Sequence, residues 1–255
     1  MRQAIVDGID HDPDFEWRGR SVTRIENLSD IIFALALGML VSSSQPPTTF
    51  SDLFNFVLNI VPVSVAFAIL LTIWNAHFVY FRRYGLADGY IIFLNAILLL
   101  LILFTAYPLR FCFDSLFGFV LFQMGYPDRL SAMLGGYREA ALVIALYNAA
   151  MSIVYFILAQ MYGHALRRKK LLDLSAREIV LTRRSVFNKY TQISTCFLAI
   201  GFALFSPLGP FAGFFTFLNP PLRAVGRFVI REKKERSDTG NEKTPAAPTP
   251  EEAMA

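Results

Sequence analysis

The chain has 255 residues, of which 55% are hydrophobic and only 17% are charged. A soluble globular domain carries about 25% charged residues, so this composition and its apolar runs of about 20 residues predict helices that cross a membrane. The formal net charge of +4 resides mainly between those runs, which indicates a topology signal rather than nucleic-acid binding.

Six apolar segments predict an all-α, six-helix transmembrane bundle. Backbone polar groups must be satisfied internally in hydrocarbon, so only helices or closed barrels cross a bilayer. The apolar runs lack the alternation of barrel strands, which excludes a barrel. The predicted helices cover about 24–44, 53–80, 88–107, 139–164, 185–205 and 210–229.

The remaining segments flank or interrupt these helices. Residues 1–20 form a predicted cytoplasmic arm, 21–230 the transmembrane domain, and 231–255 a basic and then disordered cytoplasmic tail. Residues 111–125 are apolar but too short to cross a bilayer. They are read as an extension of the third helix, a re-entrant piece or an interfacial helix.

The positions of the basic residues predict the orientation. Every lysine and arginine except Arg110, Arg129 and Arg138 falls on the same side as the two chain ends. Short loops rich in Lys and Arg stay in the cytoplasm. We therefore expect both termini in the cytoplasm and the protein in the cell membrane.

The first predicted helix carries unusually many polar residues. Its strictly apolar stretch, 31–41, is short, and an ionised aspartate at the bilayer centre costs roughly 2.5–3.5 kcal/mol. Asp30 should therefore face protein or water. Small residues spaced by four allow close approach of a second helix, and they are Ala34, Gly38 and Ser42. This helix is either the core of a bundle or the lining of a pore.

Polar side chains on the next two helices are candidate partners for Asp30. Trp74 and His77 share one face of the second helix, and Asn95 lies inside the third. Carboxylate, indole N–H, imidazole and amide groups can satisfy one another when buried. We expect no metal site or cofactor, because His77 has no second ligand at helical spacing.

Other classes of protein are disfavoured by the sequence. It contains no metalloprotease, serine-hydrolase or P-loop motif, so we do not expect an enzyme. Predicted helices two to six hold no deep ionisable pair, which weighs against an ion-coupled transporter. Cys112 and Cys196 are read as small buried hydrophobic residues.

The opening of the first helix resembles a known family signature. Arg24-Ile25-Glu26-Asn27-Leu28-Ser29-Asp30 resembles the R-x-x-x-F-S-D motif of the lysosomal potassium channel family, transmembrane protein 175, and its single-repeat prokaryotic relatives. Trp74-Asn75-Ala76-His77 is similar to the family's W-x-x-H, and Asn95 matches its third helix. The resemblance extends over roughly residues 20–230.

The resemblance implies a homotetrameric, potassium-preferring cation channel whose first helices line the pore. Its hydrophobic constriction would comprise Leu35, Met39 and Ser42. A structural network would hold the first helix, and its members would be Arg24, Ser29, Asp30, Trp74, His77 and Asn95. The implied partners are K⁺ ions, the lipid bilayer of a prokaryotic plasma membrane and further copies of the chain.

The sequence departs from the family pattern at three positions, and two other functions stay open. Leu28 replaces the signature Phe, Gly38 stands where Thr is usual, and Ser42 replaces a bulky apolar residue. One alternative is a proton-permeable channel in which Asp30 and His77 titrate. The other is a non-conducting scaffold or sensor that uses the basic loop between helices four and five and the basic tail to bind anionic lipid or a partner.

Overall fold

The structure is a computed structural model that describes residues 15–42, 46–126, 128–207, 209–219, 221, 222 and 224. Every regular element in this part of the chain is helical, as predicted. The elements are α2 (Arg24–Ser42), α3 (Phe50–Leu58), α4 (Ile60–Tyr84), α5 (Gly89–Gln123), α6 (Asp128–Met133), α7 (Tyr137–Arg167), α8 (Ala176–Phe205) and the 3₁₀ helix η1 (Gly209–Leu218).

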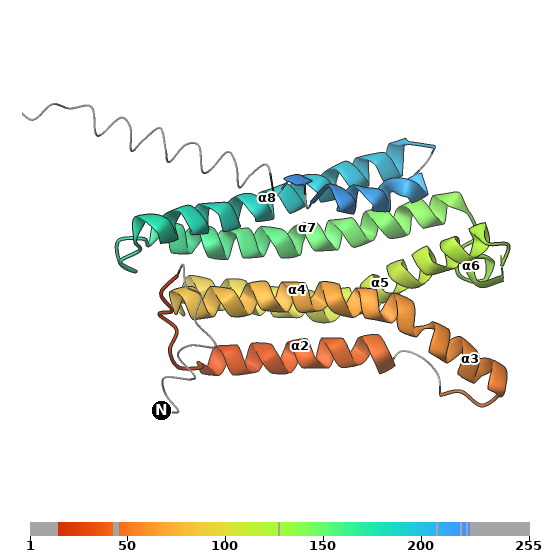
Figure 1. Cartoon of the computed structure of the whole chain (residues 1–255), viewed down its shortest axis with the longest axis horizontal. Helices are drawn as coiled ribbons and strands as arrows, with labels where there is room; N and C mark the ends of the chain where they lie inside the picture. Colours follow the sequence, from red (N-terminus) through yellow and green to blue (C-terminus); the bar gives the residue numbers. More distant parts are fainter. Residues whose placement is uncertain are drawn as a thin grey trace, which may run out of the picture.

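The long helices lie side by side in successive layers (Figure 1). α2 forms one outer layer and packs on α4 and α5, the only described elements that it contacts. α7 lies on the other side of this pair, and α8 with η1 covers α7. The signature-bearing helix is therefore at the edge of the single subunit.

Four stretches of the described residues are long and apolar enough to cross a membrane. These stretches are α2, α3 with α4, α5 and α7. The predicted fifth helix lies within α8, and the sixth, over 210–229, begins as the 3₁₀ helix η1. The predicted arm up to residue 14 and the tail from 231 onward lie outside the described residues.

The predicted third helix was too short. α5 continues through Pro108 to Gln123, so most of the 111–125 segment is its extension. A proline lacks one N–H and disturbs one turn, but the hydrogen bonds on both sides of it continue the helix. Leu109 and Arg110, directly after the proline, are buried against neighbouring helices, which favours continuation.

Two other boundaries also differ from the prediction. The second helix is divided at Asn59 into α3 and α4. The fifth begins at Ala176, because Ser175 and Glu178 form a capping box that starts α8 inside the basic segment. Much of the predicted basic loop between helices four and five is therefore helical.

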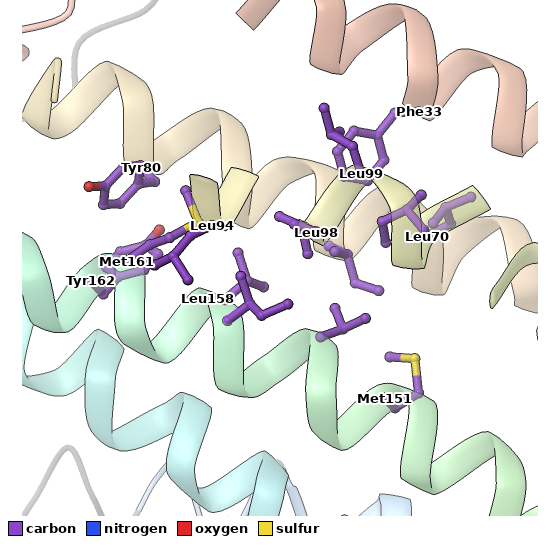
Figure 2. Packing of buried hydrophobic residues seen from close by; sticks show 14 of the residues in the cluster. Phe33, Leu70, Tyr80, Leu94, Leu98, Leu99, Met151, Leu158, Met161 and Tyr162 are labelled. Carbon is purple, nitrogen blue, oxygen red and sulfur yellow. The ribbon is translucent and has the colours of Figure 1, made fainter. Parts of the chain in front are cut away.

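The core lies where α5 packs between α2 and α7 (Figure 2). Leu98 and Leu99 of α5 lie between Phe33 of α2 on one side and Leu158 of α7 on the other. A helix that is apolar all round is normally buried by neighbours on several sides. α5 thus fixes α2 to the rest of the subunit.

Candidate functional site

One face of α2 is exposed in the part of the chain that the structure describes. We call Leu28, Ile31, Leu35, Gly38 and Ser42 the exposed stripe; each is exposed, with Leu35 at 55%. These residues follow one another at intervals of three and four, so they form a nearly straight line along the helix. The opposite face is buried against α4 and α5.

The predicted constriction residues do not all lie on this line. Leu35 and Ser42 belong to the exposed stripe, whereas Met39 is half-buried and packs on the core at its border. A step of four residues rotates a side chain by about 40° around the helix axis, which carries Met39 toward the buried side.

A buried polar relay fixes the back of α2. The His77 Nε2–H donates to Asn95 Oδ1 at 2.8 Å, and Asn95 Nδ2 donates to Ser29 Oγ at 3.0 Å. Ser29 in turn donates to the carbonyl of Ile25 at 2.8 Å. Each of the three relay side chains is at most 2% exposed, so these hydrogen bonds form away from solvent.

Asp30 has a separate attachment. Trp74 Nε1 donates to Asp30 Oδ1 at 2.8 Å, and the Trp74 ring stacks on Phe78 at 5.5 Å between centroids. The six predicted network residues are therefore not one group. Arg24 is exposed, and nothing in the described part of the chain joins it to these bonds.

Glu26 is a buried residue of this end of α2 that the sequence interpretation overlooked. Its Oε1 accepts hydrogen bonds from both the backbone N–H and the hydroxyl of Thr23, each at 3.0 Å. The Thr-x-x-Glu spacing at Thr23 and Glu26 is a helix-start signature, and it could have been recognised in the sequence. It gives α2 a defined beginning at Arg24.

His77 lies behind α2 and away from the exposed stripe. Its ring is 1% exposed and lies 5.6 Å from the Phe33 ring and 4.8 Å from the Phe81 ring. No group of three or more potential metal-ligating side chains occurs among the residues that the structure describes. In this geometry the imidazole orients Asn95.

The arm before α2 is attached to α8. Arg18 Nη1 and Nη2 donate to the two carboxylate oxygens of Glu178 at 2.8 and 3.0 Å, and Arg18 Nε donates to the carbonyl of Leu172 at 2.6 Å. Burial raises the pKa of Glu178, but the hydrogen bonds from Arg18 and from backbone N–H groups outweigh it and lower this pKa to about 2.

Two glycines let the arm approach the end of α4. Gly19 N–H donates to the carbonyl of Arg82 at 3.0 Å, and a Cβ on Gly19 would lie 2.3 Å from the carbonyl oxygen of Phe81. Gly85 ends α4 in the left-handed conformation at φ 58°. The arm therefore forms a strap across α4 to α8 just before α2 begins.

At the other end of α2, Arg110 is a second residue that the sequence interpretation misplaced. The predicted third helix ends at about 107, before Arg110, but in the structure Arg110 lies within α5 and is 7% exposed. Pro108, two residues earlier, made a helix end the natural expectation. The signal that could have identified Arg110 is its position inside a long apolar run.

A cavity of 460 Å³ lies between the first part of α4, the last part of α5, α6 and the first part of α7. Its lining is mainly apolar and includes Val65, Phe113, Phe119 and Val143. No residue of α2 lines it, so it is separate from the exposed stripe.

These features define a helical membrane protein. One long apolar helix keeps an apolar face free, and polar side chains fix its opposite face to its neighbours. Such a face in a single copy is available to lipid or to another copy.

Comparison with known proteins identifies the family. The family model described as endosomal/lysosomal potassium channel TMEM175 matches residues 24–105, which hold α2 and the relay. A protein of Marivirga tractuosa named "Potassium channel" is 32% identical over 248 residues, which cover 92% of this chain and 98% of that protein. The chain belongs to the TMEM175 potassium channel family, which confirms the resemblance of its signature residues.

Solved structures agree with this assignment. A variant of the potassium channel MtTMEM175, crystallised with a nanobody-MBP fusion, is similar with a TM-score of 0.77 and 32% identity, over 88% of this chain and all of that one. A TMEM175 homolog from Chamaesiphon minutus, described as a lysosomal potassium-selective channel, has a TM-score of 0.51 and 18% identity over 81% of this chain and 96% of that one. At that identity it supports the fold alone.

Proposed function

We propose that four copies of this chain form a potassium-preferring cation channel in a prokaryotic plasma membrane. α2 of each copy lines the pore, and Leu35 forms its narrowest apolar ring. The exposed stripe is the observation that carries the proposal, because it is a continuous, mainly apolar line on the signature-bearing helix that no other described element covers.

The spacing of the stripe supports self-association rather than contact with lipid alone. Alternating intervals of three and four are what parallel helices present to a common axis. Gly38 lies in the middle of the line, and a Cβ there meets nothing within 4 Å in one subunit. Small residues at such positions let helix backbones approach closely inside a membrane.

The chemistry of an apolar ring favours potassium. A hydrophobic constriction controls conduction by excluding water, so an ion must shed part of its hydration shell to pass. K⁺ holds that shell less tightly than Na⁺ and therefore loses it at a smaller cost. Leu35 supplies the ring, and Met39 borders it from the half-buried side. The Ser42 hydroxyl lies about two turns beyond Leu35, nearer the outer end of α2.

The polar contacts behind α2 support its orientation in this channel. The Ser29–Asn95–His77 relay and the Asp30–Trp74 bond join α2 to both α4 and α5. Two contacts on different neighbours oppose rotation of α2 about its own axis. We propose that they keep the exposed stripe directed at the pore, with Arg24 at its inner entrance.

The topology follows from the same proposal. The start of α2, the end of α4, the start of α5 and the end of α7 meet at one end of the subunit, where Arg82, Arg83, Arg167 and Arg168 gather. We assign this basic end to the cytoplasm. Six membrane helices with both termini inside complete the assignment, divided into arm, channel domain and tail as in the sequence interpretation.

Purified protein in planar bilayers tests the function directly. We expect a K⁺ current in the wild-type protein and a larger, less selective current in Leu35→Ala; a barrier lowered by about 1.4 kcal/mol would raise the current about tenfold. Leu100→Ala is the matched control, because Leu100 of α5 is 56% exposed and off the stripe. Equal currents in Leu35→Ala and wild type would show that Leu35 does not form the constriction of the pore.

The same recordings decide between the remaining functions. A non-conducting scaffold or sensor would give no ion flux in any variant. A proton-permeable channel would carry a pH-dependent current that is lost in assembled His77→Ala. Neither outcome is expected, because His77 is buried behind α2 and the exposed stripe holds no titratable side chain.

A further inference from the structure

The outer end of α2, at Ser42, has backbone carbonyls that need hydrogen-bond donors from outside the helix. The last four carbonyls of a helix have no partner inside it, and a cation near them is favourable. α2 has no basic residue in its last turn, and the next described residues are Pro46 and Pro47, of which neither has an N–H to donate. Among the described residues, the donors to this helix end come from another element.

Arg110 of α5 supplies these donors. Its Nη1 donates to the carbonyl of Leu40 and lies 3.5 Å from the carbonyl oxygen of Val41. Its Nε donates to Asp114 Oδ2 at 3.3 Å, one turn further along α5. One guanidinium thus joins the end of α2 to a carboxylate on α5, and both of these side chains are largely shielded from solvent.

This arrangement needs the planar fork of arginine. A guanidinium presents several N–H groups in fixed directions, so it can donate to a carbonyl and a carboxylate together. A buried cation is costly unless it is paired, and Asp114 provides the opposite charge. An ionisable residue inside a membrane-spanning helix is in general retained for function.

α5 consequently holds α2 at two levels. Asn95 binds Ser29 near the inner end, and Arg110 binds Leu40 near the outer end. The two contact points on α2 lie about 16 Å apart along the helix, at roughly 1.5 Å per residue. The extension of α5 through Pro108 is what brings Arg110 and Asp114 to the outer level.

We propose that Arg110 is a positioning residue for ion selectivity. It fixes the last turn of α2 and thereby the spacing of the outer part of the exposed stripe, and Asp114 orients its guanidinium. The proposal rests on the proposed function, because it requires α2 to line the pore. Loss of the contact releases the Leu40 and Val41 carbonyls and lets the last turn of α2 move, which widens the outer pore.

The test is the K⁺/Na⁺ permeability ratio, measured from reversal potentials of purified protein in planar bilayers. We expect Arg110→Gln to lower this ratio about threefold or more, since ion discrimination changes tenfold for about 1.4 kcal/mol. Arg110→Lys keeps the charge without the fork and should restore the ratio in part. Arg138→Gln is the matched control, because Arg138 is an exposed arginine at the same end of the subunit.

The controls separate positioning from stability and from the channel itself. A purely structural role would reduce the yield of assembled protein but leave its permeability ratio unchanged, and an unchanged ratio in assembled Arg110→Gln would overturn the proposal. If that variant does not assemble, Asp114→Asn, which keeps Arg110 but weakens its anchor, carries the same expectation and the same contrary result. Failure of the proposed function is distinct, because wild type and Arg138→Gln would then pass no K⁺ current.

Discussion

The two ends of α2 are held in different ways. The inner end has several attachments: the relay to Asn95 and His77, the bond from Trp74 to Asp30, and the strap that joins the preceding arm to α8. The outer end receives a hydrogen bond from Arg110, beside the apolar packing of Leu40. Several polar contacts therefore hold the inner end, whereas among the described residues the side-chain hydrogen bonds to the outer end come from one guanidinium.

In the proposed channel, this arrangement fixes α2 along its buried side and leaves its exposed stripe free to line the pore. Every attachment lies behind α2 or beyond its start, and the exposed stripe contributes to none of them. Substitutions at the inner end should act mainly on stability, because several contacts share the task. Substitutions on the stripe should act mainly on conduction.

Breaking the relay has the largest expected effect on stability. Asn95→Leu removes the acceptor of His77 and a donor to Ser29, and a buried polar group left unsatisfied costs about 1–3 kcal/mol. We expect about 2 kcal/mol of lost stability, measured by thermal unfolding in detergent. Asn75→Leu on the exposed side of α4 is the control. Equal unfolding temperatures for the two variants would contradict the relay.

The Asp30 attachment should matter less. Trp74→Phe keeps an aromatic ring against Phe78 but removes the indole N–H that donates to Asp30. Because Asp30 is exposed in the subunit, we expect a loss of about 1 kcal/mol in the same unfolding measurement. Trp17→Phe is matched, since Trp17 also contacts Phe78. A larger loss of stability in Trp17→Phe than in Trp74→Phe would show that the contact of the arm with Phe78 matters more than the Asp30 hydrogen bond.

Acid should release the strap only at low pH. The pKa of Glu178 is lowered from its ordinary 4.5 to about 2, so its contribution is present above pH 4.5 and is lost as the pH falls from 4.5 through 2. The fluorescence of Trp17, measured in a Trp74→Phe background, reports whether the arm stays in contact with α4. In Arg18→Met the pKa of Glu178 rises, so the transition should move to higher pH. An unshifted transition would exclude the Arg18–Glu178 pair as its cause.

The smallest effect on stability is expected on the stripe itself. Gly38→Ala adds a methyl group that meets nothing within 4 Å in one subunit, so the free energy of unfolding should change only by the helix preference of alanine over glycine, about 0.5–1 kcal/mol. Four added methyl groups around a shared axis should nevertheless reduce single-channel conductance. An unchanged conductance would show that Gly38 does not face the shared axis, and the pore-facing part of the stripe would then exclude it.

The sequence predicted an all-helical membrane protein and named Ser29, Asp30, Trp74, His77 and Asn95, because apolar length and the signature are local features; the count of six membrane helices stays a prediction. It did not predict that Asp30 pairs with Trp74 while Ser29 pairs with Asn95, since partner choice depends on how each helix is rotated. Arg110 was missed because Pro108 resembles a helix end, and only tertiary contacts carry α5 past it.

Metal block of an introduced cysteine tests the central claim, that the exposed stripe faces an axis shared by several copies. Cys112 and Cys196 are buried and would first be replaced by alanine. Thiolates from several subunits at one level form a site for a soft metal ion, so Leu35→Cys should give a K⁺ current that low concentrations of Cd²⁺ block and a chelator restores. Leu100→Cys should remain insensitive. A Leu35→Cys current as insensitive to Cd²⁺ as that of Leu100→Cys would contradict the account.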